Sequence, residues 1–542
     1  MWSLAKPSGR AFVLVLALAL AASGPAVAQT GKPAKDDPSE PFFRYGAIPR
    51  LVVELDDAAV ESLRNEPRKW VLGRLKENDK TVYKDVAVKL KGAAGSFREF
   101  DDQPSLSIRV DAEEEDQIFH GLKKFHLNRS PQDATRMHEL LGGEIYRAAG
   151  ILTPRVTHAR VWINKRDMGV YVLLEGFDRT LLRRGFEKTR GNLYDGGFCQ
   201  DIDGELEKDS GKGPDDRSDL KALLAACREP DLVKRWARLP ELVDIKNFIT
   251  HMAVELMLGH WDGYCGNRNN YRLYFDPSTR KAFFLPHGMD QIFQDADASI
   301  LDHPGAILAD AIMKNPAWRA DYRKRVGELL PLFNAEKLKK KIDEVQKRLA
   351  PAFQAWDKDR AREQEAAVEG LKAALDAREK SLKEQRSLPE PKPLVFTANT
   401  PVRVGRWRTN SECEDAILEA EKDNGVDVLG IKCGKSGRCV ASWRRSVLLS
   451  TGKYRFQALI RVKGVVVLKD DAPKAGAGAG LRIPGGGTRE NQLLGTGDFK
   501  RVDLEFEVTE EQRDVELIIE LRSSKGEMAV RTDSIVLMKV EK

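Results

Sequence analysis

Two neighbouring stretches of this chain decide its fold and indicate its chemistry. Residues 260–274 read HWDGYCGNRNNYRLY, and residues 283–290 read FFLPHGMD. They predict a loop carrying Asp262 and a cluster of Asn residues, followed by two strands. The turn at 276–278, Asp-Pro-Ser, folds these strands into a hairpin. Because the second strand ends at Asp290, the hairpin brings this carboxylate back towards Asp262.

This set of side chains suits phosphoryl transfer. We expect Asp262 to orient the attacking hydroxyl, while Asp290 and an Asn side chain, Asn269 or Asn270, hold Mg²⁺ against the phosphates. Each residue also has a structural alternative: Asp262 as a cap of the Gly263 turn, the Asn side chains as turn formers, and Asp290 as the partner of an Arg. Adjacent Asn residues are poor strand starters, which favours the metal or phosphate role.

A second segment has the composition of a phosphate-binding loop. Gly92, Gly95 and Ser96 follow an alternating strand, and small residues let backbone N–H groups approach phosphates. Arg98 adds a positive charge, although most loops of this kind are plain turns. Glu175, at the end of another predicted strand, is expected to pair with a lysine that holds the phosphates. Its alternative role is a surface salt bridge.

The N-terminus predicts export. Lys6 and Arg10 precede the apolar run 11–22, and the Ala-Val-Ala at 26–28 fits a small-residue cleavage site. The apolar run is short for a membrane span, so an uncleaved anchor is the less favoured alternative. We therefore expect a secreted, periplasmic or cell-envelope protein with no transmembrane span once the signal is removed.

The composition indicates a globular protein of more than one domain. The chain has 542 residues, of which 42% are hydrophobic and 32% charged, and its formal net charge is +6. This diffuse positive excess does not indicate nucleic-acid binding. Six cysteines could pair in an exported chain, and the sequence leaves their pairing open. Without a Cys-x-x-Cys pair or two His residues at ligand spacing, zinc is disfavoured.

The pattern of elements predicts the α+β class, because strands dominate the first part of the chain and helices follow them. A Lys, Glu, Ala and Arg-rich region predicts one or two long helices, broken near Pro351. Beyond a Pro-rich linker, short alternating runs separated by Gly-rich turns such as 485–487 predict an all-β sandwich. The predicted organisation is a signal peptide at 1–28, a flexible leader at 29–44, an α+β domain at 45–332, a charged helical segment at 333–388 and the sandwich at 394–542.

The motifs resemble the spore-coat CotH kinase family, a group of exported proteins with a distant protein-kinase-like fold. The resemblance covers roughly residues 82–293 and includes the segments 88–92, 125–128, 169–175 and 191–194 besides the two stretches quoted first. It implies an atypical kinase that uses ATP and Mg²⁺ (or Mn²⁺) to phosphorylate Ser or Thr of secreted or envelope proteins. It also implies Asp262 as the catalytic Asp, Asn269 or Asn270 as its helper, and Asp290 as the metal ligand.

Three positions depart from the family pattern. Gly288 stands where the family often has Asp, and Gln103 and Asp195 stand where it often has Lys. Fewer cations near phosphates weaken nucleotide binding, and the candidates to replace them are Lys89, Lys91 and Arg109. The sequence therefore leaves two alternatives: a non-catalytic envelope or matrix scaffold, and a glycoside hydrolase that uses Asp262 and Asp290 as paired carboxylates.

The C-terminal sandwich is similar to carbohydrate-binding jelly rolls, in segments 452–456, 480–483 and 533–537. This likeness implies a glycan partner. Exposed aromatic side chains stack on sugars, and the candidates for that role are Trp407, Trp443 and Tyr454. The alternative is a structural sandwich or a protein-binding module.

Overall fold

The computed structural model describes residues 37–540 except 94, 303, 390–391, 398–399, 414, 424, 469–476 and 485–490. The predicted signal peptide, most of the predicted leader and the turn at 485–487 lie outside the described residues. The chain divides into two compact units, the first ending at Ser387 and the second beginning at Leu388. Along the described part of the chain, no helix combines the length and the apolar character needed to cross a membrane.

The first unit begins with a seven-stranded closed barrel in the order β1-β2-β3-β4-β5-β7-β6. Its neighbours are antiparallel except β1 and β6, whose parallel pairing closes the barrel. The predicted alternation is confirmed, because Val86, Val88 and Leu90 of β3 are buried in the barrel core. The sequence analysis missed β2. The strands are β1 (Arg50–Glu54), β2 (Val71–Glu77), β3 (Thr81–Lys91), β4 (Ser105–Arg109), β5 (Lys124–Asn128), β6 (Val156–Ile163) and β7 (Arg166–Glu175).

A second sheet and helices α4 to α10 follow the barrel, while α3 lies between its strands β5 and β6. The sheet has the order β11-β10-β8-β9, and β10 and β11 form the predicted hairpin. Helix α7 lies in the middle of this region, and most of its side chains are buried. The elements are β8 (Leu193–Asp195), β9 (Glu207–Ser210), β10 (Tyr271–Asp276), β11 (Lys281–Pro286), α3 (His138–Ala148), α4 (Arg179–Leu182), α5 (Ser218–Cys227), α6 (Leu232–Leu242), α7 (Ile245–Leu258), α8 (Tyr264–Asn267), α9 (Ile307–Met313) and α10 (Pro316–Leu329).

Two short helices accompany the barrel and illustrate how local sequence begins a helix. These are α1 (Glu40–Tyr45) and α2 (Asp57–Asn65). Asp56 caps α2, because its carboxylate accepts a hydrogen bond of 2.7 Å from the backbone N–H of Ala59. Asp133 likewise binds the start of α3, where it accepts 2.9 Å bonds from the backbone N–H groups of Thr135 and His138.

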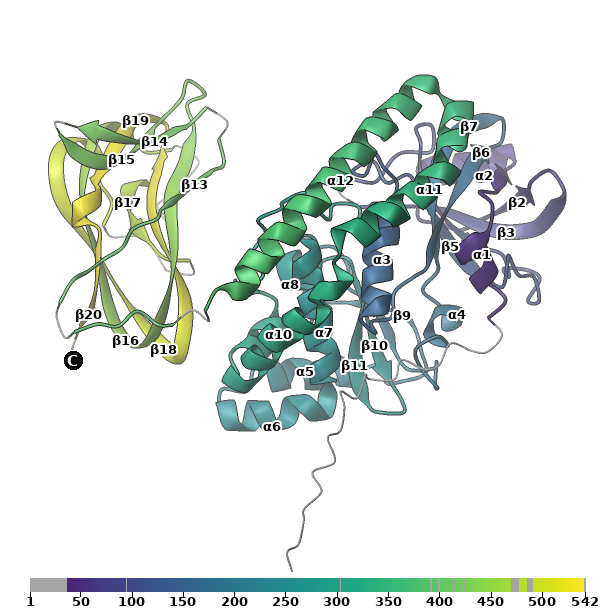
Figure 1. Ribbon diagram of the computed structural model, residues 1–542, viewed down its shortest axis with the longest axis horizontal. Helices are drawn as coiled ribbons and strands as arrows, with labels where there is room; N and C mark the ends of the chain where they lie inside the picture. Colours follow the sequence, from purple (N-terminus) through teal and green to yellow (C-terminus); the bar gives the residue numbers. More distant parts are fainter. Residues whose placement is uncertain are drawn as a thin grey trace, which may run out of the picture. The chain divides into compact units, whose positions relative to one another are not determined.

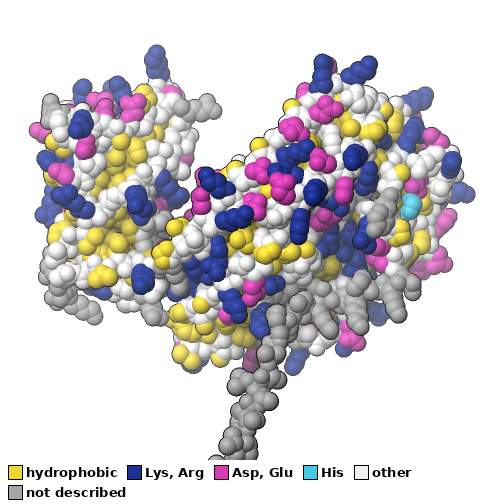
Figure 2. All heavy atoms as spheres, in the orientation of Figure 1, with side chains coloured by type: hydrophobic (Ala, Val, Ile, Leu, Met, Phe, Trp, Pro, Cys, Tyr) yellow, Lys and Arg dark blue, Asp and Glu magenta, His cyan; other side chains and the backbone are white. Residues whose placement is uncertain are grey.

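The charged region forms two helices, α11 (Ala335–Trp356) and α12 (Lys358–Ser387), which lie side by side and pack on the rest of the first unit (Figure 1). The expected break near Pro351 was wrong, because α11 continues through Pro351 to Trp356. The break falls at Asp357, whose extended backbone ends α11 and whose carboxylate accepts from the N–H groups of Asp359 and Arg360. Figure 2 shows Lys, Arg, Asp and Glu interspersed over this part of the surface.

The second unit is an all-β sandwich with a core of its own. Runs that the sequence predicted as separate short strands belong to two long strands, β16 and β18, which pair antiparallel along most of their length. The register shifts between Ser450 and Gly452, which marks the bend in β16. The strands are β12 (Val402–Arg403), β13 (Arg408–Ser411), β14 (Ile417–Asp423), β15 (Val426–Lys432), β16 (Cys439–Val466), β17 (Gly478–Arg482), β18 (Gly495–Ser523), β19 (Lys525–Arg531) and β20 (Val536–Val540).

Candidate active site

The loop after α7 holds the Asp262 carboxylate in a fixed orientation. Gly259, with φ of +63°, ends α7 in the left-handed conformation that favours glycine. The side-chain amides of three Asn residues then donate to the Asp262 carboxylate, at 2.7 Å from Asn267, 3.2 Å from Asn269 and 2.8 Å from Asn270. These three donors hold the carboxylate in one orientation. The cluster that the sequence singled out is thus one hydrogen-bonded group.

The hairpin register brings the end of β11 next to this group. The backbone N–H of His287 donates to the carbonyl of Asn270 at 3.0 Å. Gly288 follows with φ of +64°, and a Cβ there would lie 2.3 Å from Asn270 Oδ1. Asn270 therefore contacts Asp262 through its amide nitrogen and faces Gly288 with its oxygen. Asp290 lies two residues beyond Gly288.

Glu139, in the first turn of α3, holds the turn that leads to Asp290. It is buried, and its two carboxylate oxygens accept from the N–H groups of Gly288 at 3.0 Å and Met289 at 2.5 Å. His138, its neighbour, contacts the carbonyl oxygen of Asp290 through Nδ1 at 2.9 Å. The start of α3 and the end of β11 are therefore joined at the candidate metal ligand.

Lys91, the last residue of β3, faces the same place from the barrel. Its Nζ donates to Asn128 Oδ1 of β5 at 2.7 Å. Burial lowers the pKa of Lys91 to about 8, although the negative charges of Glu139 and Asp290 act to raise it. Burial and then the charge of Asp290 raise the pKa of Glu139 to about 7. Burial and then the charge of Asp133 raise the pKa of Asp290 to about 6. Such a group of desolvated charges is typical of a functional site.

Further cations surround this group. Arg272 of β10 forms an ion pair with Asp195, its register partner on β8, and burial lowers the pKa of Arg272 to about 9. Burial also lowers the pKa of Lys124 on β5. These cations and Lys91 act with burial to hold the pKa of His126 well below its usual value. Where the family often has a lysine at position 195, this chain thus has a cation on the adjacent strand.

The loop after β3 directly follows Lys91. Gly92 and Gly95 have φ of +112° and +79°, a conformation in which glycine is favoured. The Ser96 hydroxyl accepts from the N–H of Ala93 at 3.1 Å. The Arg98 guanidinium donates to the carbonyls of Gly95 and Phe97 at 3.2 and 2.6 Å. These contacts stabilise the shape of the loop.

The structure does not bring Glu175 to this group. Glu175 is fully buried and accepts from Arg155 at 2.9 Å and from Arg184 at 2.6 Å. The acidic partner that faces Lys91 is Glu139, which the sequence analysis did not single out. A signal existed, because Glu139 lies in the first turn of a helix whose first N–H, that of His138, donates to Asp133. Choosing it required knowing that this end of the helix meets β3 and β11.

The fold and the site define an α+β protein in which a barrel and a helical region meet at an acidic centre surrounded by cations. The family described as CotH kinase protein matches residues 88–382, more than half of the chain. The chain therefore belongs to the CotH kinase protein family.

Relatives are similar at low identity. Invasin CotH2 of Rhizopus delemar (strain RA 99-880) is 23% identical over 356 residues, which make up 58% of this chain and 59% of that protein. The chain thus spans about 59% of the length of that relative. Inner spore coat protein H of Bacillus subtilis (strain 168) is 22% identical over 262 residues, 43% of this chain and 69% of that protein.

Among solved structures, the proinflammatory kinase CtkA of Helicobacter pylori is 12% identical, covering 54% of this chain and 96% of its own, with a TM-score of 0.27. A TM-score this low supports no argument about function.

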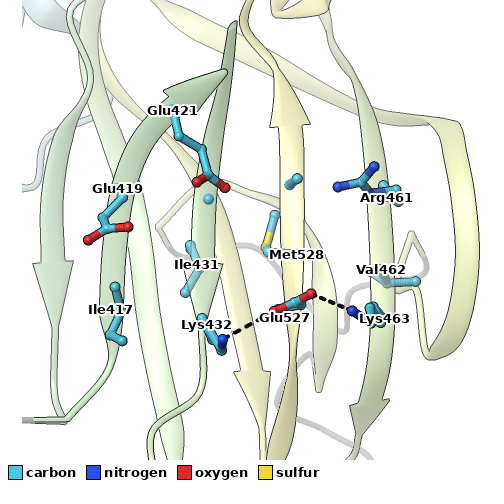
Figure 3. Close-up of a pocket in the computed structure, with 12 residues that line it drawn as sticks. Ile417, Glu419, Glu421, Ile431, Lys432, Arg461, Val462, Lys463, Glu527 and Met528 are labelled. Atoms are coloured by element: carbon cyan, nitrogen blue, oxygen red, sulfur yellow. Dashed lines mark ion pairs between the residues drawn. The ribbon is translucent and has the colours of Figure 1, made fainter. Parts of the chain in front are cut away.

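The second unit does not offer the aromatic residues expected to stack on sugars. Trp443 and Tyr454 are buried, and Trp407 stacks on Phe456 of the core. This unit does have an open groove of about 250 Å³ across β14, β15, β19 and β16 (Figure 3). In the groove Glu527 lies between two lysines, 3.9 Å from Lys432 and 3.4 Å from Lys463.

Proposed function

We propose that this protein is an exported CotH-like protein kinase that transfers the γ-phosphoryl group of ATP to Ser or Thr of secreted or envelope proteins. The observation that carries the proposal is the pairing of two groups: Asp262, held by three Asn amides, and, beyond the contact of Asn270 with Gly288, the buried Glu139 with the half-buried Lys91 and Asp290. Phosphoryl transfer needs a positioned carboxylate, oxygen ligands for a metal and cations for the phosphates.

The residues fit Mg²⁺·ATP by the chemistry of their donors. Carboxylate and amide oxygens are the ligands that Mg²⁺ prefers, and Asp290 with Asn269 or Asn270 would supply them. When bound, Mg²⁺·ATP supplies the γ-phosphoryl group and partial neutralisation of its charge. Mn²⁺ suits the same ligands.

Each residue then has a role in the transfer. Asp262 orients the acceptor hydroxyl and accepts its proton, because three amides hold the carboxylate in one position. Lys91, held by Asn128 and facing the charge of Glu139, donates to the phosphate oxygens, a charge-assisted contact that is stronger in a desolvated site. Lys124 and Arg272 add positive charge, and the segment from Gly92 to Arg98 covers the phosphates.

The envelope location and the partners are part of the same proposal. The names of two relatives, an inner spore coat protein and an invasin, support a place at the cell envelope or outside it. The second unit would bind a glycan or protein partner in its polar groove. With the candidate aromatics packed in the core, a glycan there would be held by hydrogen bonds from charged side chains such as Arg461 and Glu421.

The test measures Mg²⁺·ATP binding by calorimetry and autophosphorylation with labelled ATP. We expect Asp262→Asn to lower the phosphorylation rate at least about 100-fold while the affinity for Mg²⁺·ATP stays within a few-fold. Asp290→Asn should weaken the binding itself. Lys124→Ala should weaken it moderately, whereas Lys123→Ala is the matched control, because Lys123 pairs at the surface with Asp111.

If the Asp262→Asn variant binds Mg²⁺·ATP and is phosphorylated as fast as the wild-type protein, the role assigned to Asp262 is wrong. If the wild-type protein shows no heat of binding with Mg²⁺·ATP or Mn²⁺·ATP, the kinase proposal fails and the scaffold alternative holds. Release of reducing sugar from envelope glycans would instead favour the glycoside hydrolase.

A further inference from the structure

We propose that His251, Glu255 and Cys265 form a structural site for one divalent transition-metal ion, zinc in the first place, in the core beneath the Asp262 loop. One ligand atom of each residue lies within 4.8 Å of the other two. The site uses none of the residues assigned to phosphoryl transfer, so it stands or falls independently of the proposed function.

The local sequence explains why these residues meet. His251 and Glu255 are four residues apart on α7, so both side chains lie on the same face of the helix. Cys265 comes from α8, which the loop after Gly259 returns against α7. At exposed fractions of 0%, 1% and 0%, the three side chains are closed off from solvent.

Their polar atoms lack the partners that buried groups normally have. Among the described residues, three of these atoms make no hydrogen bond: the two ring nitrogens of His251 and the Oε2 atom of Glu255. His251 Nε2 and Glu255 Oε2 lie 3.0 Å apart, the distance of an ion pair if the imidazole is protonated, but they make no hydrogen bond. Buried polar side chains are almost always paired. A cation among these atoms would satisfy them together.

The surroundings orient the carboxylate towards the cluster. Glu255 Oε1 accepts a 2.6 Å bond from the backbone N–H of Cys265, which leaves Oε2 directed at His251. Gly263 packs directly on this carboxyl group, because a Cβ there would lie 2.5 Å from Glu255 Cδ. Such contacts to a ligand's second atom are typical of metal sites.

The donor set indicates the class of metal. Imidazole nitrogen, thiolate sulfur and carboxylate oxygen are the three ligand types of zinc, which is bound by four of them in structural sites. The hydroxyl of Tyr146 is the candidate for the fourth ligand, because it is buried without a hydrogen-bond partner among the described residues. Glu255 and Cys265 are near enough to this hydroxyl to contribute to raising its pKa.

No motif in the sequence predicts this site, because its ligands include neither a Cys-x-x-Cys pair nor a pair of His residues. Its consequence is mechanical. A metal here would tie the second half of α7 to α8, and α8 lies between Asp262 and Asn269. The ion would thus fix the loop that carries the candidate catalytic carboxylate.

The experiment uses the full chain, produced once with added Zn²⁺ and once with added Co²⁺. We expect about one metal ion per chain by elemental analysis. The Co²⁺ protein should show a thiolate-to-cobalt charge-transfer band and the visible bands of a tetrahedral ion. Cys265→Ser should remove the charge-transfer band, whereas Cys227→Ser, at a buried cysteine outside the cluster, should keep it.

If the Cys265→Ser variant fails to fold, the metal content and the Co²⁺ spectrum of the wild-type protein test the proposal on their own. A wild-type chain that contains less than about a tenth of an equivalent of metal and gives no charge-transfer band with Co²⁺ overturns the proposal. The cluster is then a metal-free buried hydrogen-bonding group. A charge-transfer band that survives in a folded Cys265→Ser variant overturns it as well.

Discussion

At the scale of single residues, Gly288 shows how one backbone conformation shapes the site. Its φ of +64° and the nearness of Asn270 leave no room for a side chain, although the family often has Asp at this position. The chain thus has no carboxylate at this position. The backbone N–H of Gly288 donates to the carboxylate of Glu139.

We expect Gly288→Ala to lower the free energy of unfolding by about 2 kcal/mol or more, because it adds the cost of a left-handed non-glycine residue to a clash. Gly370→Ala is the control. Gly370 is exposed within α12 with open space around it, so alanine should raise stability by up to about 1 kcal/mol. Urea denaturation of both variants checks this, and equal stabilities for Gly288→Ala and wild type would contradict the geometry.

The raised pKa of Asp290 predicts that the free energy of unfolding depends on pH. Its folded pKa, about 6, is above the ordinary value of 3.8, so its contribution to stability is fully present below pH 3.8 and is lost as the pH rises through 6. Without metal at pH 8, Asp290→Asn should therefore raise the free energy of unfolding, by about 1–2 kcal/mol. At pH 3.5 the two proteins should be equally stable. Urea denaturation in chelator at both pH values measures this, and a stabilisation that is independent of pH would be inconsistent with it.

At the scale of elements, α12 is fixed to the rest of the first unit by one buried cation. Arg378 is fully buried and donates to four backbone carbonyls, two at the end of α7 and two in the loop between β11 and α9. A cation at a helix C-terminus is favourable, and here it also joins three segments that are distant in sequence.

Arg378→Met should lower the free energy of unfolding by about 3–5 kcal/mol, because it leaves buried carbonyls without donors. Lys380→Met on the same helix is the matched control, since its side chain is 79% exposed and its ion pair with Glu384 is long, at 3.9 Å. That change should stay within about 0.5 kcal/mol. Similar losses in the two variants would show that Arg378 does not hold α12 in place.

Elements were predicted where their signal is local. The alternation of β3, the cap of α2 and the β10–β11 hairpin follow from neighbouring residues. The break between α11 and α12 was misplaced, because proline is a strong local signal and Asp357 a weak one. Tertiary packing carries α11 through Pro351, and the cap at Asp357 starts the next helix.

At the scale of the whole molecule, the two long helices share the core of the first unit. Apolar side chains of both are buried in the same cluster as those of α7, among them Ile342, Leu349 and Leu375. The predicted division at residue 332 stays a prediction, and this shared core gives it a direct test.

A fragment of residues 37–387 should unfold cooperatively at the midpoint that the first unit has in the full chain. A fragment of residues 37–332 should not fold, because it lacks Arg378 and exposes the core that α11 and α12 cover. Circular dichroism during thermal denaturation compares them, with residues 388–542 as the reference for the second unit. A cooperative transition of the 37–332 fragment would show that the helices form a separate segment.

The sequence by itself determined the class of fold, the family, the loop of Asp262 and the hairpin of β10 and β11, whereas β11 ends at Pro286 and a turn at Gly288 leads on to Asp290. All of these depend on periodicity, turns and motifs that are written in neighbouring residues. Only the tertiary structure decided that Glu139 rather than Glu175 faces Lys91, that Arg272 lies opposite Asp195, and that His251, Glu255 and Cys265 meet. These contacts join separate elements, and their partners are selected by how helices and strands pack and by which charges burial forces together.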